Sequence, residues 1–82
     1  MTHDAARVVV LVREGCHLCD DALQVIETVC REHDVPWRAV DVDADADLRA
    51  RWNDHVPVTL VDGRQHSLWF VDPDALRAAL RS

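Results

Sequence analysis

Hydrophobic and polar positions recur with two different periods in the first half of the chain, and each period predicts its own kind of element. The apolar, β-branched run at 7–12 is typical of a strand that is covered on both faces. From 18 to 32, apolar residues return every three or four positions, which indicates a helix with one buried face. Alternation at 37–42 predicts a second strand, and the acidic residues that open 45–52 favour a short helix.

The second half of the chain predicts a β-hairpin. Strand-like runs at 58–61 and 65–71 are joined around Asp62-Gly63, a pair that favours a tight turn between antiparallel strands. Trp69, in the second run, is interpreted as an aromatic residue of the core or of the sheet face, or as part of a substrate groove. The two runs therefore add an antiparallel pair to the strands of the first half.

A closing helix completes the predicted fold. Asp72 followed by Pro73 is typical of an N-cap with proline at the first helical position, so we place a helix at 73–80. The resulting order, β-α-β-α-β-β-α, predicts an α/β fold in which a four-stranded mixed sheet is flanked by three helices. Since 82 residues suffice for one compact domain and not for two, we expect a single domain over 1–82.

Charge and the first residues narrow the function classes. With 15 acids against 9 bases and a formal charge of −6, the chain is unsuited to sequence-independent nucleic-acid binding or to an anionic membrane surface. The opening MTHDAA lacks the basic start and apolar stretch of an export signal, so we expect a cytoplasmic protein. In a reducing compartment, three cysteines indicate catalysis or metal binding rather than structural disulfides.

A Cys-X-X-Cys motif falls where the first predicted strand ends and the first helix begins. The unpaired N–H groups and partial positive charge of a helix N-terminus favour a thiolate over a thiol. Two intervening residues place the sulfurs of Cys16 and Cys19 one helical turn apart, within reach of a reversible disulfide. We therefore expect Cys16, beside Gly15, to be the more exposed sulfur and the attacking nucleophile, and Cys19 to be the resolving thiol.

Other interpretations of these residues stay open. Cys30 projects from the same helix face as Cys19 but about 16 Å further along, which predicts a small buried hydrophobe. A zinc site would need a second pair of ligands that the sequence does not supply, so no metal is expected. The alternating acids at 41–47 do not form a calcium loop, because the position that requires glycine is Ala46 or Leu48. The alternative function classes are a thioredoxin-fold binding module without redox activity and, after it, a metal-binding Cys-X-X-Cys protein.

Two further features lie around the cysteines and before the third strand. Arg13, three residues before Cys16, and His17 inside the motif are suited to holding a thiolate or an anionic substrate group nearby. Val56-Pro57 stands directly before the strand at 58–61, where proline is tolerated as the first residue of a strand. From the pattern alone, Pro57 is a strand-start proline, and Arg13 and His17 join the two cysteines as candidate site residues.

Together, these residues resemble the glutaredoxin branch of the thioredoxin superfamily over essentially the whole chain. The match rests on Arg13, the motif of Cys16 and Cys19, and Val56-Pro57 before a strand. The resemblance implies the thioredoxin/glutaredoxin fold and a thiol–disulfide oxidoreductase with a redox-active Cys16–Cys19 disulfide and no bound cofactor. It also implies that Pro57 is cis and packs near the disulfide, and that the Val56 backbone pairs with a bound thiol peptide.

The sequence departs from the glutaredoxin pattern at two places. His17-Leu18 replaces the usual Pro-Tyr between the cysteines, and 70–74 lacks the Gly-Gly pair that precedes the last helix. Asp74 matches the family's acidic position there, so the resemblance assigns Asp74, with Arg13, to substrate or glutathione binding. His17 is a candidate for the same role because of its place inside the motif. The implied partners are a disulfide-containing protein or a low-molecular-weight thiol, with glutathione or a flavoprotein reductase as electron donor, and we expect a monomer.

Overall fold

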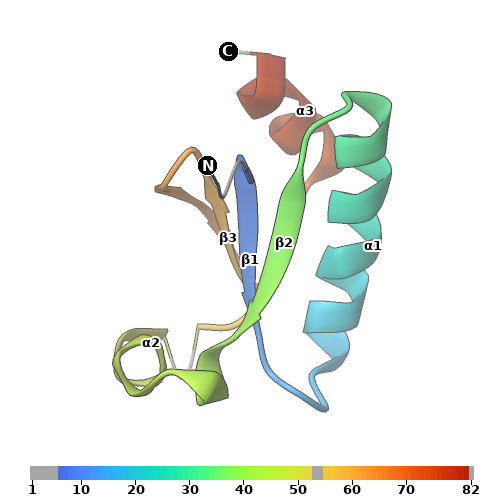
Figure 1. Ribbon diagram of the computed structural model, residues 1–82. Coiled ribbons are helices and arrows are strands. Elements are labelled where there is room, and N and C mark those ends of the chain that lie inside the picture. The colour runs from blue at the N-terminus through green and yellow to red at the C-terminus, as the bar shows by residue number, and fades with distance from the viewer. Residues whose placement is uncertain (1–5, 53–54, 82) are drawn as a thin grey trace.

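The computed structural model describes residues 6–52 and 55–81, which form one four-stranded sheet with helices on both sides (Figure 1). The order of the strands across the sheet is β2-β1-β3-β4. The predicted α/β order of strands and helices is confirmed. The strands are β1 (Val8–Val12), β2 (Trp37–Asp41), β3 (Val58–Val61) and β4 (Arg64–Leu68). The helices are α1 (His17–Glu32), α2 (Ala46–Trp52) and α3 (Pro73–Arg81), and a 3₁₀ turn, η1 (Val42–Ala44), precedes α2.

The strand pairing gives the sheet its mixed character. β1 runs parallel to β2, while β3 is antiparallel to β1 and to β4. Leu11 of β1 lies opposite Val58 of β3, so Pro57 comes level with the end of β1. The segment that leaves β1 toward α1 and the segment that enters β3 therefore lie at the same end of the sheet.

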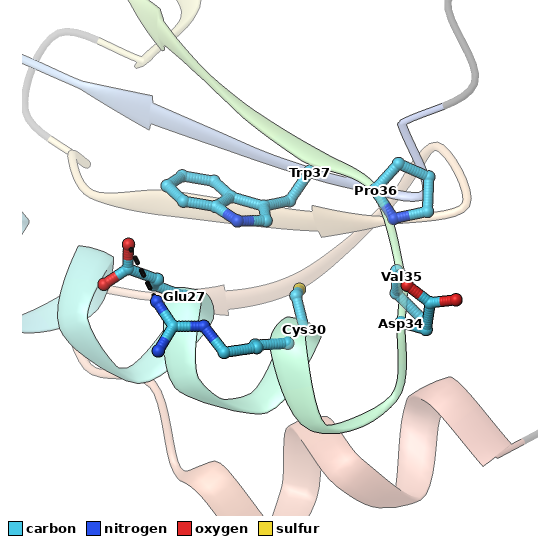
Figure 2. Close-up of a pocket in the computed structure, with 7 residues that line it drawn as sticks. Glu27, Cys30, Asp34, Val35, Pro36 and Trp37 are labelled. Atoms are coloured by element: carbon cyan, nitrogen blue, oxygen red, sulfur yellow. Dashed lines mark ion pairs between the residues drawn. The ribbon is translucent and has the colours of Figure 1, made fainter.

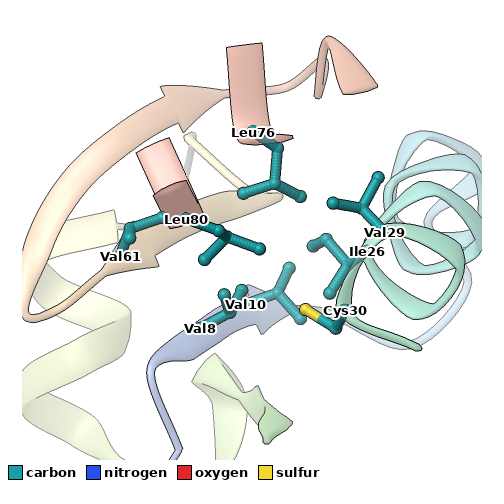
Figure 3. Close-up of a cluster of buried hydrophobic side chains, with 8 residues drawn as sticks. All are labelled: Val8, Val10, Ile26, Val29, Cys30, Val61, Leu76 and Leu80. Atoms are coloured by element: carbon teal, nitrogen blue, oxygen red, sulfur yellow. The ribbon is translucent and has the colours of Figure 1, made fainter. Parts of the chain in front are cut away.

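One face of the sheet is covered by α1 and α3. Their apolar residues and those of the sheet form the larger core, in which Ile26 and Leu76 are fully buried (Figure 3). Burial of side chains of this size is the main source of folding free energy. The buried members of this core are Val8, Val10, Ile26, Val29, Cys30, Val61, Leu76 and Leu80.

The opposite face carries a smaller core. Leu11, Val42 and Val58 are buried there, and Leu48 and Trp52 of α2 pack against them half-exposed. No residue of α2 is itself buried. In Figure 1, α2 lies on the side of the sheet away from α1, near the end where β1 leads into α1.

Two predicted boundaries are wrong, for local reasons. The strand expected at 65–71 ends at Leu68, because Trp69 has a φ of 65° and Phe70 N–H donates to the carbonyl of Leu68, closing a γ-turn. The strand expected to reach 42 ends one residue earlier, where η1 begins.

The predicted start of the last helix is confirmed, since Asp72 Oδ1 accepts from the N–H of Asp74. Within the described ranges, no helix is long and apolar enough to cross a membrane.

Candidate functional site

The motif cysteines lie at the N-terminus of α1. Cys16 is the N-cap residue, and its Sγ accepts a hydrogen bond from the backbone N–H of Cys19 at 3.1 Å. Gly15, just before it, has a φ of 78°, a left-handed conformation that glycine adopts without steric cost. Cys16 is half-buried, whereas Cys19 is only 2% exposed. The outer sulfur is thus accessible and bonded to a helix N–H, and the inner sulfur is shielded.

The surroundings of Cys19 raise the pKa of its thiol. Burial, and after it the hydrogen bond with Cys16, raises the pKa of Cys19 from an ordinary 9.0 to about 11. A hydrogen bond with the Arg13 backbone acts in the opposite direction, and the nearby Asp20 carboxylate adds to the rise. Cys19 therefore stays a thiol near neutral pH.

The segment before β3 lies at the same end of the sheet as this helix terminus. The Val56-Pro57 peptide bond is cis, as the resemblance implies, and Pro57 is buried while Val56 is half-buried. The Pro57 carbonyl accepts a hydrogen bond from the N–H of Trp69 at 2.8 Å. The loop at 69–72 therefore meets the cis-proline segment at the end of the sheet where β1 leads to the cysteines.

Aromatic rings from three segments contact one another near the place where the loop at 69–72 meets Pro57. The ring of His55 stacks on Trp69 at 6.4 Å and meets Trp52 edge-on at 6.1 Å, measured between ring centroids. Trp69 is 44% exposed and Phe70 is 70% exposed. Trp69 is thus not a core residue, and Trp69 and Phe70 are exposed apolar residues of the loop whose backbone bonds to Pro57.

Arg13 does not point into open solvent. Its Nε and Nη2 donate to the two carboxylate oxygens of Asp43 in η1, each at 3.0 Å. These hydrogen bonds hold the pKa of Asp43 below its ordinary value. Asp43 was missed by sequence reasoning, because only the parallel pairing of β1 with β2 brings a residue 30 positions away beside Arg13.

The remaining predicted site residues lie apart from one another. His17 is exposed at the first position of α1. Asp74 is exposed in the first turn of α3, where its carboxylate accepts a hydrogen bond from Arg77 at 2.9 Å. Arg77 also donates to both oxygens of Glu32, which ties α3 to the end of α1.

Cys30 lies far from the motif, near the other end of α1. It is 1% exposed, and burial raises the pKa of its thiol. In Figure 2 its side chain points from α1 toward Trp37, and both line a hollow of about 380 Å³. The prediction that Cys30 is a small buried hydrophobe is confirmed, and this hollow is separate from the motif.

The donor set for a metal ion is poor. Among residues 6–52 and 55–81, no group of three or more histidine, cysteine or acidic side chains is arranged to hold a metal. All three cysteines are free thiols in the structure.

The sequence is similar to a family of small domains and to proteins of mycobacteria. A family model described as "Glutaredoxin-like domain (DUF836)" matches residues 7–81. The uncharacterized protein Rv0508 of Mycobacterium tuberculosis is 38% identical over 77 aligned residues, which cover 88% of this chain and 79% of the relative. The uncharacterized protein Mb0520 of Mycobacterium bovis gives the same values.

Solved structures resemble the fold over nearly its whole length. The X-ray structure of protein XcR50 from X. campestris has a TM-score of 0.74 and 31% identity, covering 90% of this chain and 95% of that one. Protein Ne2328 from Nitrosomonas europaea has a TM-score of 0.74 and 26% identity, with 95% and 94% coverage. Thioredoxin 1 of Thermosipho africanus has a TM-score of 0.62 and 16% identity, covering 90% of this chain and 93% of that one. At this identity the likeness shows the thioredoxin fold alone.

Proposed function

The chain belongs to the family of glutaredoxin-like domains in the thioredoxin superfamily, and on this premise we propose that it is a thiol–disulfide oxidoreductase. The observation that carries the proposal is the hydrogen bond from the N–H of Cys19 to the Cys16 sulfur at the start of α1. A backbone N–H directed at sulfur, with the helix dipole behind it, stabilises the thiolate that disulfide exchange requires.

The two cysteines have different roles in the proposed reaction. The Cys16 thiolate attacks one sulfur of a substrate disulfide, so the substrate S–S bond breaks and a mixed disulfide forms. The sulfur that leaves takes a proton and departs as a thiol. Cys19 then loses its proton and attacks the Cys16 sulfur, which releases the second substrate thiol and leaves a Cys16–Cys19 disulfide. The substrate gains two electrons, and the cysteine pair loses them.

The accessibility of the sulfurs supports this order of events. Cys16 is half-buried and reachable, while Cys19 is buried and retains its proton until the mixed disulfide has formed. The raised pKa of Cys19 keeps the inner sulfur from competing as the first nucleophile. Val56, before the cis-proline, offers backbone groups to an extended substrate at the same end of the sheet.

Each cycle needs an outside reductant. A dithiol or two monothiols must return two electrons to the Cys16–Cys19 disulfide, and glutathione or a flavoprotein reductase is the proposed donor. No prosthetic cofactor takes part in the proposed exchange. A disulfide-containing protein and a low-molecular-weight thiol are the two proposed substrate classes, and action as a monomer in the cytoplasm belongs to the same proposal.

Single cysteine variants test the proposal. We expect the wild-type protein to reduce a peptide disulfide, Cys16→Ser to lose this activity, and Cys19→Ser to accumulate a mixed disulfide that mass spectrometry detects. Cys30→Ala, which removes a cysteine outside the motif, is the matched control and should retain activity. In glutathione redox buffers, the pair should titrate reversibly between about −180 and −280 mV.

Each other result has a distinct meaning. If Cys16→Ser still forms the mixed disulfide, the assignment of the nucleophile is wrong. A pair that never oxidises in these buffers would identify a binding module without redox activity. Metal that survives purification and protects both motif cysteines from alkylation would identify a metal site instead.

A further inference from the structure

Arg13, the cationic side chain next to the motif, is already paired with an acidic residue of the same chain. Arg13 meets Asp43 through two parallel hydrogen bonds of 3.0 Å, the geometry in which a guanidinium binds a carboxylate most specifically. Asp43 is fixed in turn by its own N–H, which donates to Asp41 Oδ1 at 2.9 Å. A carboxylate of η1 therefore stands where the carboxylate of a small substrate would otherwise bind Arg13.

The second place suited to an anion, the start of α3, is filled in the same way. Asp72 Oδ1 accepts from the N–H of Asp74 at 3.0 Å, and Pro73 between them has no N–H to offer. The nearby Arg77 is shared by the carboxylates of Glu32 and Asp74. The helix terminus and its adjacent cation thus both have internal acidic partners.

The charges closest to the cysteines are negative as well. Glu14, Asp20 and Asp21 are exposed within five residues of Cys16. The N–H of Asp20 donates to the Cys16 carbonyl at 3.3 Å, which places this acid one turn above the sulfur. A field of this sign slows the approach of an anion and leaves a neutral disulfide unaffected.

We propose that Asp43 is a specificity residue that makes small anionic thiols, such as glutathione, poorer substrates of the candidate redox site than neutral ones. The favoured substrate is then a polypeptide disulfide that has no carboxylate beside its sulfurs. Trp69 and Phe70, exposed in the loop whose backbone bonds to Pro57, are available to its apolar side chains. This inference rests on the proposed oxidoreductase function.

The test compares one peptide in two forms. Its single cysteine is joined in a mixed disulfide either to glutathione, which is anionic, or to 2-mercaptoethanol, which is neutral. The rate constant for reduction by the pre-reduced protein is measured for both forms, and their ratio, glutathione over mercaptoethanol, reports the discrimination. We expect Asp43→Asn to raise this ratio about fivefold, the upper range for a partly exposed ion pair. Asp43→Ser, a second neutral replacement, should do the same.

The chain offers a matched control. Asp62 forms an equivalent pair with Arg7, with bonds of 3.0 and 2.9 Å, at the opposite end of β1 and β3. Asp62→Asn removes the same charge far from the cysteines and should leave the ratio unchanged. The gain of Asp43→Asn should vanish when Arg13→Gln is added, and should shrink as salt is raised.

The outcomes separate this inference from the proposed function. If both variants at position 43 fold, as judged by thermal unfolding, and the ratio stays at the wild-type value, the specificity role is wrong while the reductase remains. An equal rise in Asp62→Asn would also overturn it, since net charge alone would then be the cause. Failure of the wild-type protein to reduce either mixed disulfide would refute the oxidoreductase itself.

Discussion

The shielded sulfur of Cys19 allows a direct chemical prediction. A Cys16→Ser/Cys30→Ala double variant has Cys19 as its only cysteine, so labelling by iodoacetamide reports that thiol alone. Burial, the largest cause of its raised pKa, persists when serine replaces Cys16, whereas the sulfur hydrogen bond is lost. We therefore expect most of the protection to survive in this variant.

The size of the effect follows from the pKa. A rise from 9.0 to about 11 retains the proton to higher pH, and each unit lowers the thiolate fraction about tenfold at neutral pH. The full shift corresponds to labelling about a hundredfold slower than for an unperturbed thiol. Because one of its causes is removed in the variant, we expect labelling at about pH 7.5 to be at least tenfold slower than in denaturant.

The assay is the rate of labelling measured by mass spectrometry across a range of pH. Poor access alone would slow labelling equally at every pH, whereas a raised pKa makes the rate climb beyond the pH at which an ordinary thiol is fully ionised. The reasoning is refuted if the native rate reaches half of its plateau near pH 9, which is where an unperturbed thiol does. A Cys19→Ser/Cys30→Ala variant, which carries only the half-buried Cys16, should label faster than the Cys19 variant at neutral pH.

Two further predictions concern the core that supports the site. Ile26→Ala removes a side chain that is 0% exposed, and we expect the free energy of unfolding in urea to fall by about 2–5 kcal/mol. The control variant Gln24→Ala, on the exposed face of α1, should change this free energy little. Cys30→Ala should lower the free energy of unfolding by about 1 kcal/mol and leave the rate of disulfide exchange at the wild-type value. A lower exchange rate would show that Cys30 takes part in the chemistry.

Strands and helices with a buried face were predictable from the sequence, because burial makes apolar residues recur along the chain with a regular spacing. The apolar run of β1 and the threefold and fourfold spacing in α1 both follow from the core between them. The end of β4 was not predictable, since Trp69 and its neighbours are good strand formers. The turn there depends on the Trp69 N–H reaching the Pro57 carbonyl, which is a tertiary contact.

The candidate site divides in the same way. A motif of local spacing was enough to place Cys16 and Cys19 at a helix N-terminus, and the resemblance to glutaredoxins implied the cis bond before Pro57. The partner of Arg13 could not be read from spacing, because Asp43 reaches it only through the pairing of adjacent strands. The interaction that most changes the expected role of Arg13 is therefore a long-range one.

The unequal covering of the two sheet faces has a consequence for motion. The helix that follows Asp43, α2, contributes no buried residue, whereas α1 contributes five of the residues most shielded from water. Segments with little buried apolar surface open at lower free energy than the rest of a domain, so we expect amide protons around α2 to exchange before those of α1. Asp43 thus precedes the helix that we expect to open more easily, whereas Arg13 precedes the more stable α1. Local opening around α2 would therefore break the Arg13–Asp43 hydrogen bonds transiently and free the guanidinium.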